Sequence, residues 1–251
     1  MRGRRHLVFN FDIGKRKFTH QGSGDQCPFC NREELSEILD KQGSLLLVKN
    51  KYQTLADTFQ TVLIETDDCS ADITTYDTDH LRRVITFGTD HWLKMEESGE
   101  YESVVFYKNH GPLSGGTISH AHMQIVGLKN IDYRQGLSDE VFGGIEIHKE
   151  GNCSVNLSTR PGACSVEFNI ITFPRYDEFM ADNIQKLVKY LLSRIKCTSY
   201  NLFFYLWNGS IICKVVPRFV TSPFLVGYSI AQTSNRLKAI AEEVQRKFYG
   251  K

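Results

Sequence analysis

Residues 115–126 read Gly115-Gly-Thr-Ile-Ser-His-Ala-His-Met-Gln-Ile-Val126. Because successive side chains of a β-strand point to opposite faces, His120, His122 and Gln124 share one face of the strand that this stretch predicts. The apolar residues between them face the other way, into a core. Three polar groups in a row are costly unless they are hydrogen-bonded or used. Ordinary strand residues facing water are the alternative, but the glycine-rich turn directly before the strand favours a functional site.

The glycine-rich turn and the histidines suit the chemistry of phosphate groups. Backbone N–H groups of a glycine turn can approach an anion closely, and the hydroxyls of Thr117 and Ser119 add donors. A neutral, well-oriented imidazole is a competent nucleophile near neutral pH. Its attack at phosphorus would give a covalent phosphoimidazole, and Gln124 could donate to a non-bridging oxygen as charge develops there.

The rest of the chain predicts an α+β fold. Strand, helix, strand and strand recur at a spacing of about 90 residues, so we expect two fused repeats, residues 1–150 and 151–251, with helices packed on an antiparallel sheet. A short helical segment is expected over residues 33–39. Strands are expected over residues 44–49, 61–66, 102–108, 121–128, 165–173, 200–207 and 210–216, and longer helices over residues 77–95, 182–194 and 234–248.

The composition excludes several classes of protein. The chain has 251 residues, a net charge of +1, 41% hydrophobic and 24% charged residues, which is ordinary for a globular protein. The near-neutral net charge gives no excess of basic residues that would indicate binding to nucleic acid or to a membrane surface. The longest apolar run, residues 202–207, is far short of the roughly 18 residues of a membrane span, and the apolar stretch after the basic start is too short for a signal peptide. We therefore expect a cytoplasmic protein with no nucleic-acid or membrane partner.

The seven cysteines are too few and too scattered for a disulfide-stapled scaffold. Cys27 and Cys30 form a C-x-x-C pair, which in a reducing compartment is a metal clip or a redox pair. A redox pair would open a helix after a strand, whereas residues 22–26 read as a loop. This difference favours the metal clip.

The strand resembles the active-site strand of galactose-1-phosphate uridylyltransferase, in the histidine-triad (HIT) superfamily. Those transferases carry His-Pro-His-x-Gln, and this sequence has His120-Ala-His-Met-Gln124, with Ala121 in place of the proline. The resemblance implies that His122 is the catalytic nucleophile and that Gln124 donates to a phosphate oxygen. It also implies that both repeats are HIT-like. The second is degenerate, because residues 210–216 contain none of the histidines that form a second metal site in some members.

The resemblance extends to the substrate site in both halves of the chain. The loop before the active strand aligns without gaps with the family's nucleotide-binding loop, and an asparagine after an early strand matches one near the nucleoside. A later Phe-Leu-Val-Gly-Tyr segment resembles the family's Phe-x-Val-Gly-Tyr. The residues expected at the substrate are Asn50, Asn109, Gly115, Gly116, Thr117, Ser119, Phe224, Val226 and Tyr228.

The same family often carries a structural zinc held by a C-x-x-C, a histidine from a turn and the first histidine of the active strand. Here Cys69 occupies the turn histidine's place, so the resemblance implies one Cys3His zinc site of Cys27, Cys30, Cys69 and His120. A small buried thiol is the alternative for Cys69. The other four cysteines are expected to be core thiols.

These features predict a nucleotidyltransferase that moves a nucleoside monophosphate from a nucleotide-sugar or related diphosphate donor, through His122, to a phosphorylated acceptor. A phosphorylase or hydrolase of the same superfamily is the enzyme alternative. A non-catalytic, zinc-stabilised module is the other. In one form Cys27, Cys30, His120 and His122 make a Cys2His2 structural zinc site of a binding module, and in another a degenerate enzyme retains nucleotide binding only. Lys214 and Arg218 could meet an acceptor phosphate or be solvated surface charges. The oligomeric state stays open, with a homodimer as one option.

Overall fold

The computed structural model describes residues 6–15, 27–174, 176 and 178–250, so the loop expected over residues 22–26 lies outside the described residues. The chain divides into two compact units, which are described here one at a time. The first unit takes residues 1–71, 88–106 and 120–133, and the second takes residues 72–87, 107–119 and 134–251. In the described part of the chain, no helix has the length and apolar character needed to cross a bilayer.

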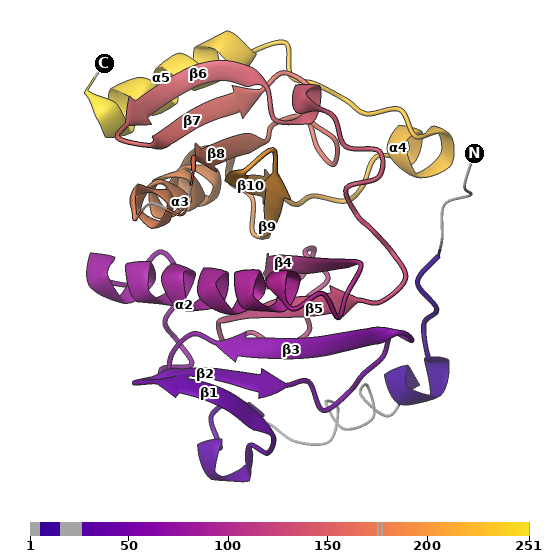
Figure 1. Cartoon of the computed structure of the whole chain (residues 1–251). Coiled ribbons are helices and arrows are strands. Elements are labelled where there is room, and N and C mark those ends of the chain that lie inside the picture. The colour runs from indigo at the N-terminus through magenta and orange to yellow at the C-terminus, as the bar shows by residue number, and fades with distance from the viewer. Residues whose placement is uncertain (1–5, 16–26, 175, 177, 251) are drawn as a thin grey trace. The chain divides into compact units, whose positions relative to one another are not determined.

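The first half of the chain supplies five strands and the long helix α2 (Figure 1). Neighbouring strands follow the order β1-β2-β3-β5-β4, and the pairs β1–β2, β2–β3 and β3–β5 are antiparallel. In the β3–β5 register, Ile64 lies opposite His122 and Val62 opposite Gln124. The bounds are β1 (Ile38–Gln42), β2 (Leu45–Lys49), β3 (Thr58–Ile64), α2 (Thr78–Glu97), β4 (Ser103–His110) and β5 (His122–Leu128).

The second half repeats this arrangement within the second unit. The strand order is β6-β7-β8-β10-β9, the pairs β6–β7, β7–β8, β8–β10 and β9–β10 are antiparallel, and α3 packs against β8 and β10. The helix α5 packs on β6 (Figure 1). The bounds are β6 (Gly144–Glu150), β7 (Cys153–Ser158), β8 (Phe168–Thr172), α3 (Phe179–Tyr190), β9 (Tyr200–Trp207), β10 (Ser210–Pro217), α4 (Pro223–Tyr228) and α5 (Leu237–Tyr249), with short helical turns at η1 (Arg32–Glu34), η2 (Asp139–Val141) and η3 (Leu191–Ile195).

The two halves therefore share one topology. Each has three consecutive strands, a helix and two more strands, and in each the fifth strand pairs with the third. By this correspondence β10 is the equivalent of β5. The expected α+β fold, two fused repeats with helices packed on antiparallel strands, is confirmed.

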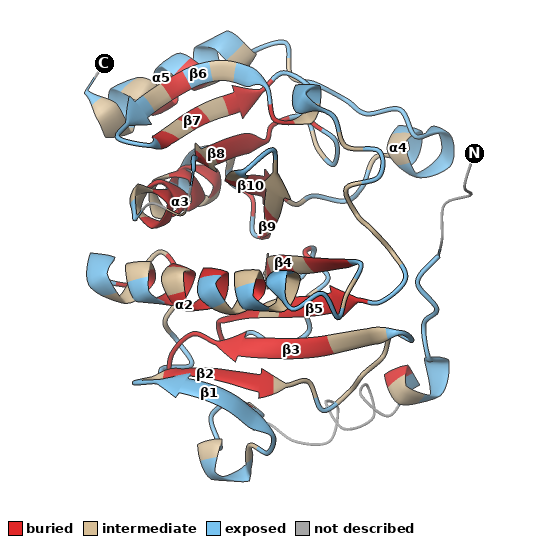
Figure 2. Ribbon diagram, in the orientation of Figure 1, coloured by how far each residue is buried: buried red, intermediate tan, exposed pale blue. Residues whose placement is uncertain are grey.

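The helical segment expected over residues 33–39 is wrong. Only η1 is helical there, and the chain continues into β1, which forms a hairpin with β2 through Gly43 at φ +60°. β1 is exposed along its whole length beside the buried β2 (Figure 2). A strand with no buried face has no apolar alternation to reveal it, because its conformation comes from pairing with a buried neighbour. The strands β6 and β7 and the helix α4 were also not expected.

The buried side chains form a core in each unit. In the first, Leu63, Ile64, Met123 and Ile125 are fully buried, and Trp92 donates its indole N–H to the carbonyl of Val104 at 2.8 Å. In the second, Cys153, Cys197 and Cys213 are buried, as expected for core thiols, whereas Cys164 is half-buried.

A buried ion pair crosses the strands of the second unit. Lys214 Nζ on β10 lies 2.9 Å from Glu167 Oε2, and the two side chains are 5% and 3% exposed. Glu167 Oε1 also accepts from the backbone N–H groups of Gly162 and Ala163 at 2.9 and 2.6 Å. The Lys214 ammonium is therefore buried and paired with a carboxylate inside the unit. Both expectations for it, an acceptor-phosphate contact and a solvated charge, are wrong.

Lys214→Met should lower the free energy of unfolding by about 3 kcal/mol, because it leaves the Glu167 carboxylate buried without its counter-charge. Urea denaturation would measure the change. The matched control is Lys49→Met, which removes a surface partner of Glu37 and should cost less than about 1 kcal/mol. Equal losses in the two variants would contradict the structural role of the buried pair.

Candidate functional site

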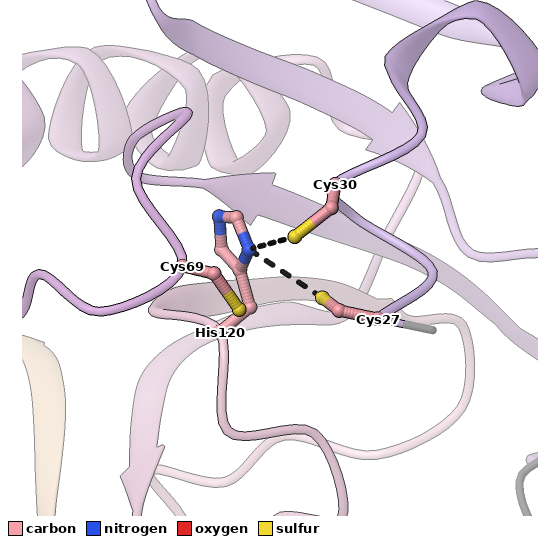
Figure 3. A group of neighbouring side chains, drawn as sticks. All are labelled: Cys27, Cys30, Cys69 and His120. Carbon is pink, nitrogen blue, oxygen red and sulfur yellow. Dashed lines mark hydrogen bonds between the residues drawn. The ribbon is translucent and has the colours of Figure 1, made fainter. Parts of the chain in front are cut away.

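Cys27, Cys30, Cys69 and His120 lie together in the first unit (Figure 3). One ligand atom from each residue lies within 4.8 Å of the other three. The closest approaches are from His120 Nδ1 to the sulfurs of Cys27 and Cys30, at 3.5 and 3.6 Å. The four residues come from three separate stretches of sequence, so tertiary folding assembles the cluster.

Local turns present the three thiols. A tight turn, in which Cys30 N–H donates to the Cys27 carbonyl at 3.1 Å, puts both sulfurs of the C-x-x-C pair on one side. Cys69 follows β3 in a turn shaped by Asp68, whose Oδ1 accepts from the backbone N–H and hydroxyl of Ser70 at 2.8 and 2.6 Å. Aspartate and serine are typical of such turns because their side chains bond the backbone nearby.

The ring of His120 is fixed from its far side. It is fully buried, and its Nε2 lies 2.8 Å from the carbonyl oxygen of Thr66, which also accepts from Arg32 Nη2 at 2.6 Å. A carbonyl can only accept, so Nε2 carries the proton and Nδ1 presents its lone pair to the thiols. A hydrogen bond from the ring nitrogen that does not face the metal is the usual way in which a metal-binding histidine is oriented.

The donor set fits a metal ion that prefers sulfur and nitrogen. Desolvation of the thiol by the surrounding protein atoms and its hydrogen bonds with Cys30 and Cys27 raise the pKa of Cys69 to about 12, and a side-chain hydrogen bond with Cys27 raises the pKa of Cys30. Crowded thiols resist ionisation because their thiolates would repel one another, and a divalent cation reverses that balance. Three cysteines and one histidine with Nδ1 facing inward form a closed tetrahedral set.

The structure distinguishes between the two metal sites that the sequence left open. Among the described residues, the cluster contains Cys69 and not His122. Cys69 is exposed, so the alternative of a small buried thiol is wrong. The Cys2His2 arrangement, which needed His122 as a ligand, is not the one that the structure forms.

His122 is the first residue of β5, and His120 lies in the turn before it. Its Nδ1 lies 2.8 Å from the carbonyl oxygen of His120, so Nδ1 carries a proton, and in the neutral form of the ring the lone pair is on Nε2. Phe29, inside the C-x-x-C turn, lies edge-on to both imidazoles, with ring centroids 5.9 Å from His120 and 5.3 Å from His122. The thiol cluster, its turn and the His122 ring thus form one packed unit.

The other expected site residues of the first unit lie on β5 and after β2. Gln124, two residues beyond His122, is half-buried between the fully buried Met123 and Ile125. Asn50 directly follows β2, and its Oδ1 accepts from the backbone N–H of Tyr52 at 2.9 Å. This bond leaves the Asn50 amide nitrogen as the group that can donate.

The glycine-rich loop belongs to the second unit. Gly115 has φ +90° with open space where a side chain would be, and a Cβ on Gly116 would lie 3.1 Å from the Cβ of Asn109. Ser114 closes the turn by donating its hydroxyl to the Gly111 carbonyl at 2.7 Å. The hydroxyl-bearing residues Thr117 and Ser119 are exposed. The loop therefore presents backbone and hydroxyl groups at its surface.

The Phe-Leu-Val-Gly-Tyr segment forms α4 in the second unit. Pro223 starts the helix, and the Ser222 hydroxyl accepts from the backbone N–H of Phe224 at 3.3 Å. Proline at the first helical position after a serine cap is a recognised helix start, and this signal could have predicted α4. Its expected substrate residues Phe224, Val226 and Tyr228 are 55%, 74% and 74% exposed.

Comparison with protein families covers nearly the whole chain. Residues 9–131 match the N-terminal domain, and residues 134–249 the C-terminal domain, of a family described as a domain of unknown function, DUF4931. The chain belongs to the DUF4931 family. No curated protein matches the sequence.

Solved structures connect this family to a wider fold. A DUF4931 family protein from Bacillus cereus ATCC 10987 is 45% identical, with a TM-score of 0.77 over 84% of this chain and 99% of its own. A GalT-like protein from Arabidopsis thaliana is 15% identical, with a TM-score of 0.72 over 88% and 92% of the two chains. An Arabidopsis ADP-glucose phosphorylase, solved with ADP-glucose, is 13% identical, with a TM-score of 0.71 over 90% and 93%. The chain has the fold of the GalT-like proteins, which is the fold that the resemblance of the strand implied.

Some residues of the site have no signal in the sequence pattern. The Thr66 carbonyl orients His120, yet backbone oxygens leave no trace in residue identity. Phe29 could be noticed only as a residue inside the C-x-x-C, and nothing in its spacing connects it with His122. Both contacts depend on the meeting of separate chain segments.

Cys69→Ala should lower the bound metal from about one ion per chain to a small fraction, because a structural zinc site needs four ligands. Cys69→His should retain the metal, since imidazole nitrogen replaces thiolate sulfur in such sites. Elemental analysis of the purified, dialysed proteins measures both. Cys164→Ala, which changes a half-buried cysteine outside the cluster, is the control. Full metal retention in Cys69→Ala would remove Cys69 from the ligand set.

Proposed function

We propose that the protein is a nucleotidyltransferase that moves a nucleoside monophosphate from a diphosphate-linked donor to a phosphorylated acceptor through a covalent nucleotidyl-His122. The observation that carries the proposal is the bond between His122 Nδ1 and the His120 carbonyl. It selects the tautomer with the lone pair on Nε2 and fixes the ring plane. An oriented neutral imidazole is the state that a histidine nucleophile requires.

The first step forms the covalent intermediate. Nε2 of His122 attacks the α-phosphorus of the donor, an N–P bond forms, and the P–O bond to the leaving phosphate breaks with its electron pair on the leaving oxygen. Gln124 donates from its side-chain amide to a non-bridging oxygen. Catalysis of this kind relies on positioning and on donors aimed at developing charge.

The second step returns the enzyme. An oxygen of the acceptor attacks the same phosphorus, and the N–P bond breaks with its electron pair returning to Nε2. With a sugar phosphate as acceptor the protein is a transferase, with orthophosphate a phosphorylase, and with water a hydrolase. The ADP-glucose phosphorylase among the similar structures makes orthophosphate an acceptor to test first.

The remaining expected residues hold the nucleotide. Asn50 donates near the nucleoside, and Asn109 and Thr117 donate to ribose and phosphate oxygens. The backbone N–H groups of Gly115 and Gly116, with the hydroxyl of Ser119, complete an anion-binding loop. Phe224, Val226 and Tyr228 supply the exposed apolar groups on the sugar or acceptor side.

We further propose that the metal of the Cys3His cluster is a structural zinc. A closed set of four protein ligands leaves no position for substrate, so the ion supports the fold and not the chemistry. Its role is to hold the His120 peptide, whose carbonyl fixes the ring of His122. Zinc at this place therefore acts on catalysis only through geometry.

Trapping the intermediate tests the mechanism. The protein is incubated without acceptor with UDP-, ADP- and GDP-sugars and with dinucleoside polyphosphates, and its intact mass is measured under alkaline conditions. We expect one nucleoside-monophosphate adduct, which also names the base. His122→Asn and His122→Gly should lose it, with turnover falling by about 10⁴-fold or more, as for loss of a catalytic nucleophile.

The exposed His6 provides the matched control, because His6→Asn should keep the adduct. No adduct with any donor, together with nucleotide binding that His122→Asn leaves unchanged, would refute the transferase and favour the non-catalytic nucleotide-binding module. Adduct discharge by orthophosphate, a sugar phosphate or water then distinguishes the three enzyme classes.

A further inference from the structure

Asn201, on β9 of the second unit, lies at the centre of a hydrogen-bond network that holds the glycine-rich loop. Its side chain is 1% exposed. Its Nδ2 lies 2.7 Å from Asn109 Oδ1, 3.1 Å from the Ser114 carbonyl oxygen and 3.3 Å from the Lys108 carbonyl oxygen, so one of its two hydrogens is shared between two acceptors. One buried amide therefore bonds the loop at its start and at its turn.

Arg218, directly after β10, sets the direction of the Asn201 amide. Its Nη1 donates to Asn201 Oδ1 at 3.0 Å. Guanidinium has donors and no acceptor, so the oxygen of Asn201 must face Arg218 and its nitrogen must face the loop. The three loop atoms on that side are all oxygen acceptors, which agrees with this orientation. Arg218 is half-buried and bonded to Asn201, so the expectation that it is a solvated surface charge is wrong.

The orientation of the Asn201 amide also fixes the orientation of the next amide, that of Asn109. Because Asn201 donates to its Oδ1, the amide oxygen of Asn109 is turned towards β9 and its Nδ2, with two hydrogens, points away from that oxygen in the same amide plane. The guanidinium of Arg218 thus donates to the amide of Asn201, which in turn donates to the amide of Asn109. Asn109 presents donors, not an acceptor, to whatever binds beside the loop.

A second contact fixes the backbone of the loop. The Ser199 hydroxyl accepts from the backbone N–H of Leu113 at 3.0 Å. Gly111 has φ +80°, and a Cβ there would lie 2.2 Å from the Thr198 carbonyl oxygen, so the loop lies directly on the chain that leads into β9. Residues 198–201 therefore hold the loop at two separate points.

We propose that Arg218 and Asn201 are positioning residues that hold the loop over residues 109–115 and orient the Asn109 amide as a donor to ribose or phosphate oxygens. The identity of that ligand rests on the proposed function. The anchoring of the loop does not, because it follows from contacts inside the second unit. Neither residue touches the reacting atoms in this scheme, and each acts through Asn109 and the loop backbone.

Hydrogen exchange without nucleotide tests the anchoring. Asn201→Leu removes the donor, and Asn201→Asp keeps the size but replaces it with a carboxylate that repels the three loop oxygens. Both should speed exchange of the Leu113 and Ser114 amides about tenfold or more, because the loop opens more easily. Exchange over residues 144–158 should not change. The matched control is Asn156→Asp, which alters another asparagine pair of the same unit, Asn156 with Asn169.

Binding of ADP and UDP, measured by calorimetry, tests the role of the Asn109 amide. Asn201→Asp should weaken binding by about tenfold or more, since the Asn109 amide must rotate to donate to the new carboxylate and then presents its oxygen to the ligand. Arg218→Met should weaken it less, and Arg218→Lys, which keeps a charged donor, should restore part of the loss. In turnover, the effect should fall on KM more than on kcat, because these contacts exist in the ground state.

The outcomes separate this inference from the proposed function. Unchanged exchange and unchanged nucleotide affinity in both Asn201 variants would overturn it, as would equal effects in Asn156→Asp. Faster loop exchange in a protein whose wild type binds neither nucleotide and forms no adduct would support the anchoring and refute the proposed function. Faster exchange with weaker binding and an intact wild-type adduct supports both.

Discussion

The hydrogen bond between His120 Nε2 and the Thr66 carbonyl decides the geometry of the first unit's site. It makes Nδ1 the atom that faces the three thiols, so the cluster has four ligand atoms. A bound metal then immobilises the His120 peptide, whose carbonyl fixes the tautomer of His122. Phe29, from the same turn that carries Cys27 and Cys30, lies edge-on to both rings. A metal held by this cluster would therefore also restrain the ring of His122, because the two histidines are only two residues apart in the chain.

The two halves share one topology but carry different side chains on equivalent strands. β5 and β10 are equivalent strands, but β5 carries the histidine and glutamine of the candidate site, whereas β10 carries Lys214, locked to Glu167 in the interior. The second half thus has the same strand topology, with a buried ion pair on the strand that is equivalent to β5. Its Asn201, on β9, bonds the glycine-rich loop through Asn109.

Much of the fold could be predicted from the sequence where burial leaves a pattern. The buried strands β2, β3, β5, β9 and β10 and the helices α2, α3 and α5 follow from apolar runs and helical spacing. β1 could not be predicted, because all five of its residues are exposed and pairing with β2 alone makes it a strand. β7 carries an alternating pattern, with Cys153, Val155 and Leu157 buried, so its sequence could have predicted this strand. Its partner β6 has a mostly exposed face and an irregular register, so its sequence signal is weak.

The sequence by itself determined the chemical groups of this protein: the His-x-His-x-Gln strand, the glycine-rich loop and the C-x-x-C pair are present in residue identity and spacing. It could not decide between Cys69 and His122 as the fourth ligand, because both residue types bind zinc. The tertiary structure decided which residue is the fourth ligand. It places the turn with Cys69 beside His120, and it uses Nδ1 of His122 in a hydrogen bond to the carbonyl of His120. It also decided the partners of Asn109 and Lys214. These contacts form between backbone oxygens and side chains that are far apart in the sequence. Local sequence patterns therefore do not reveal them.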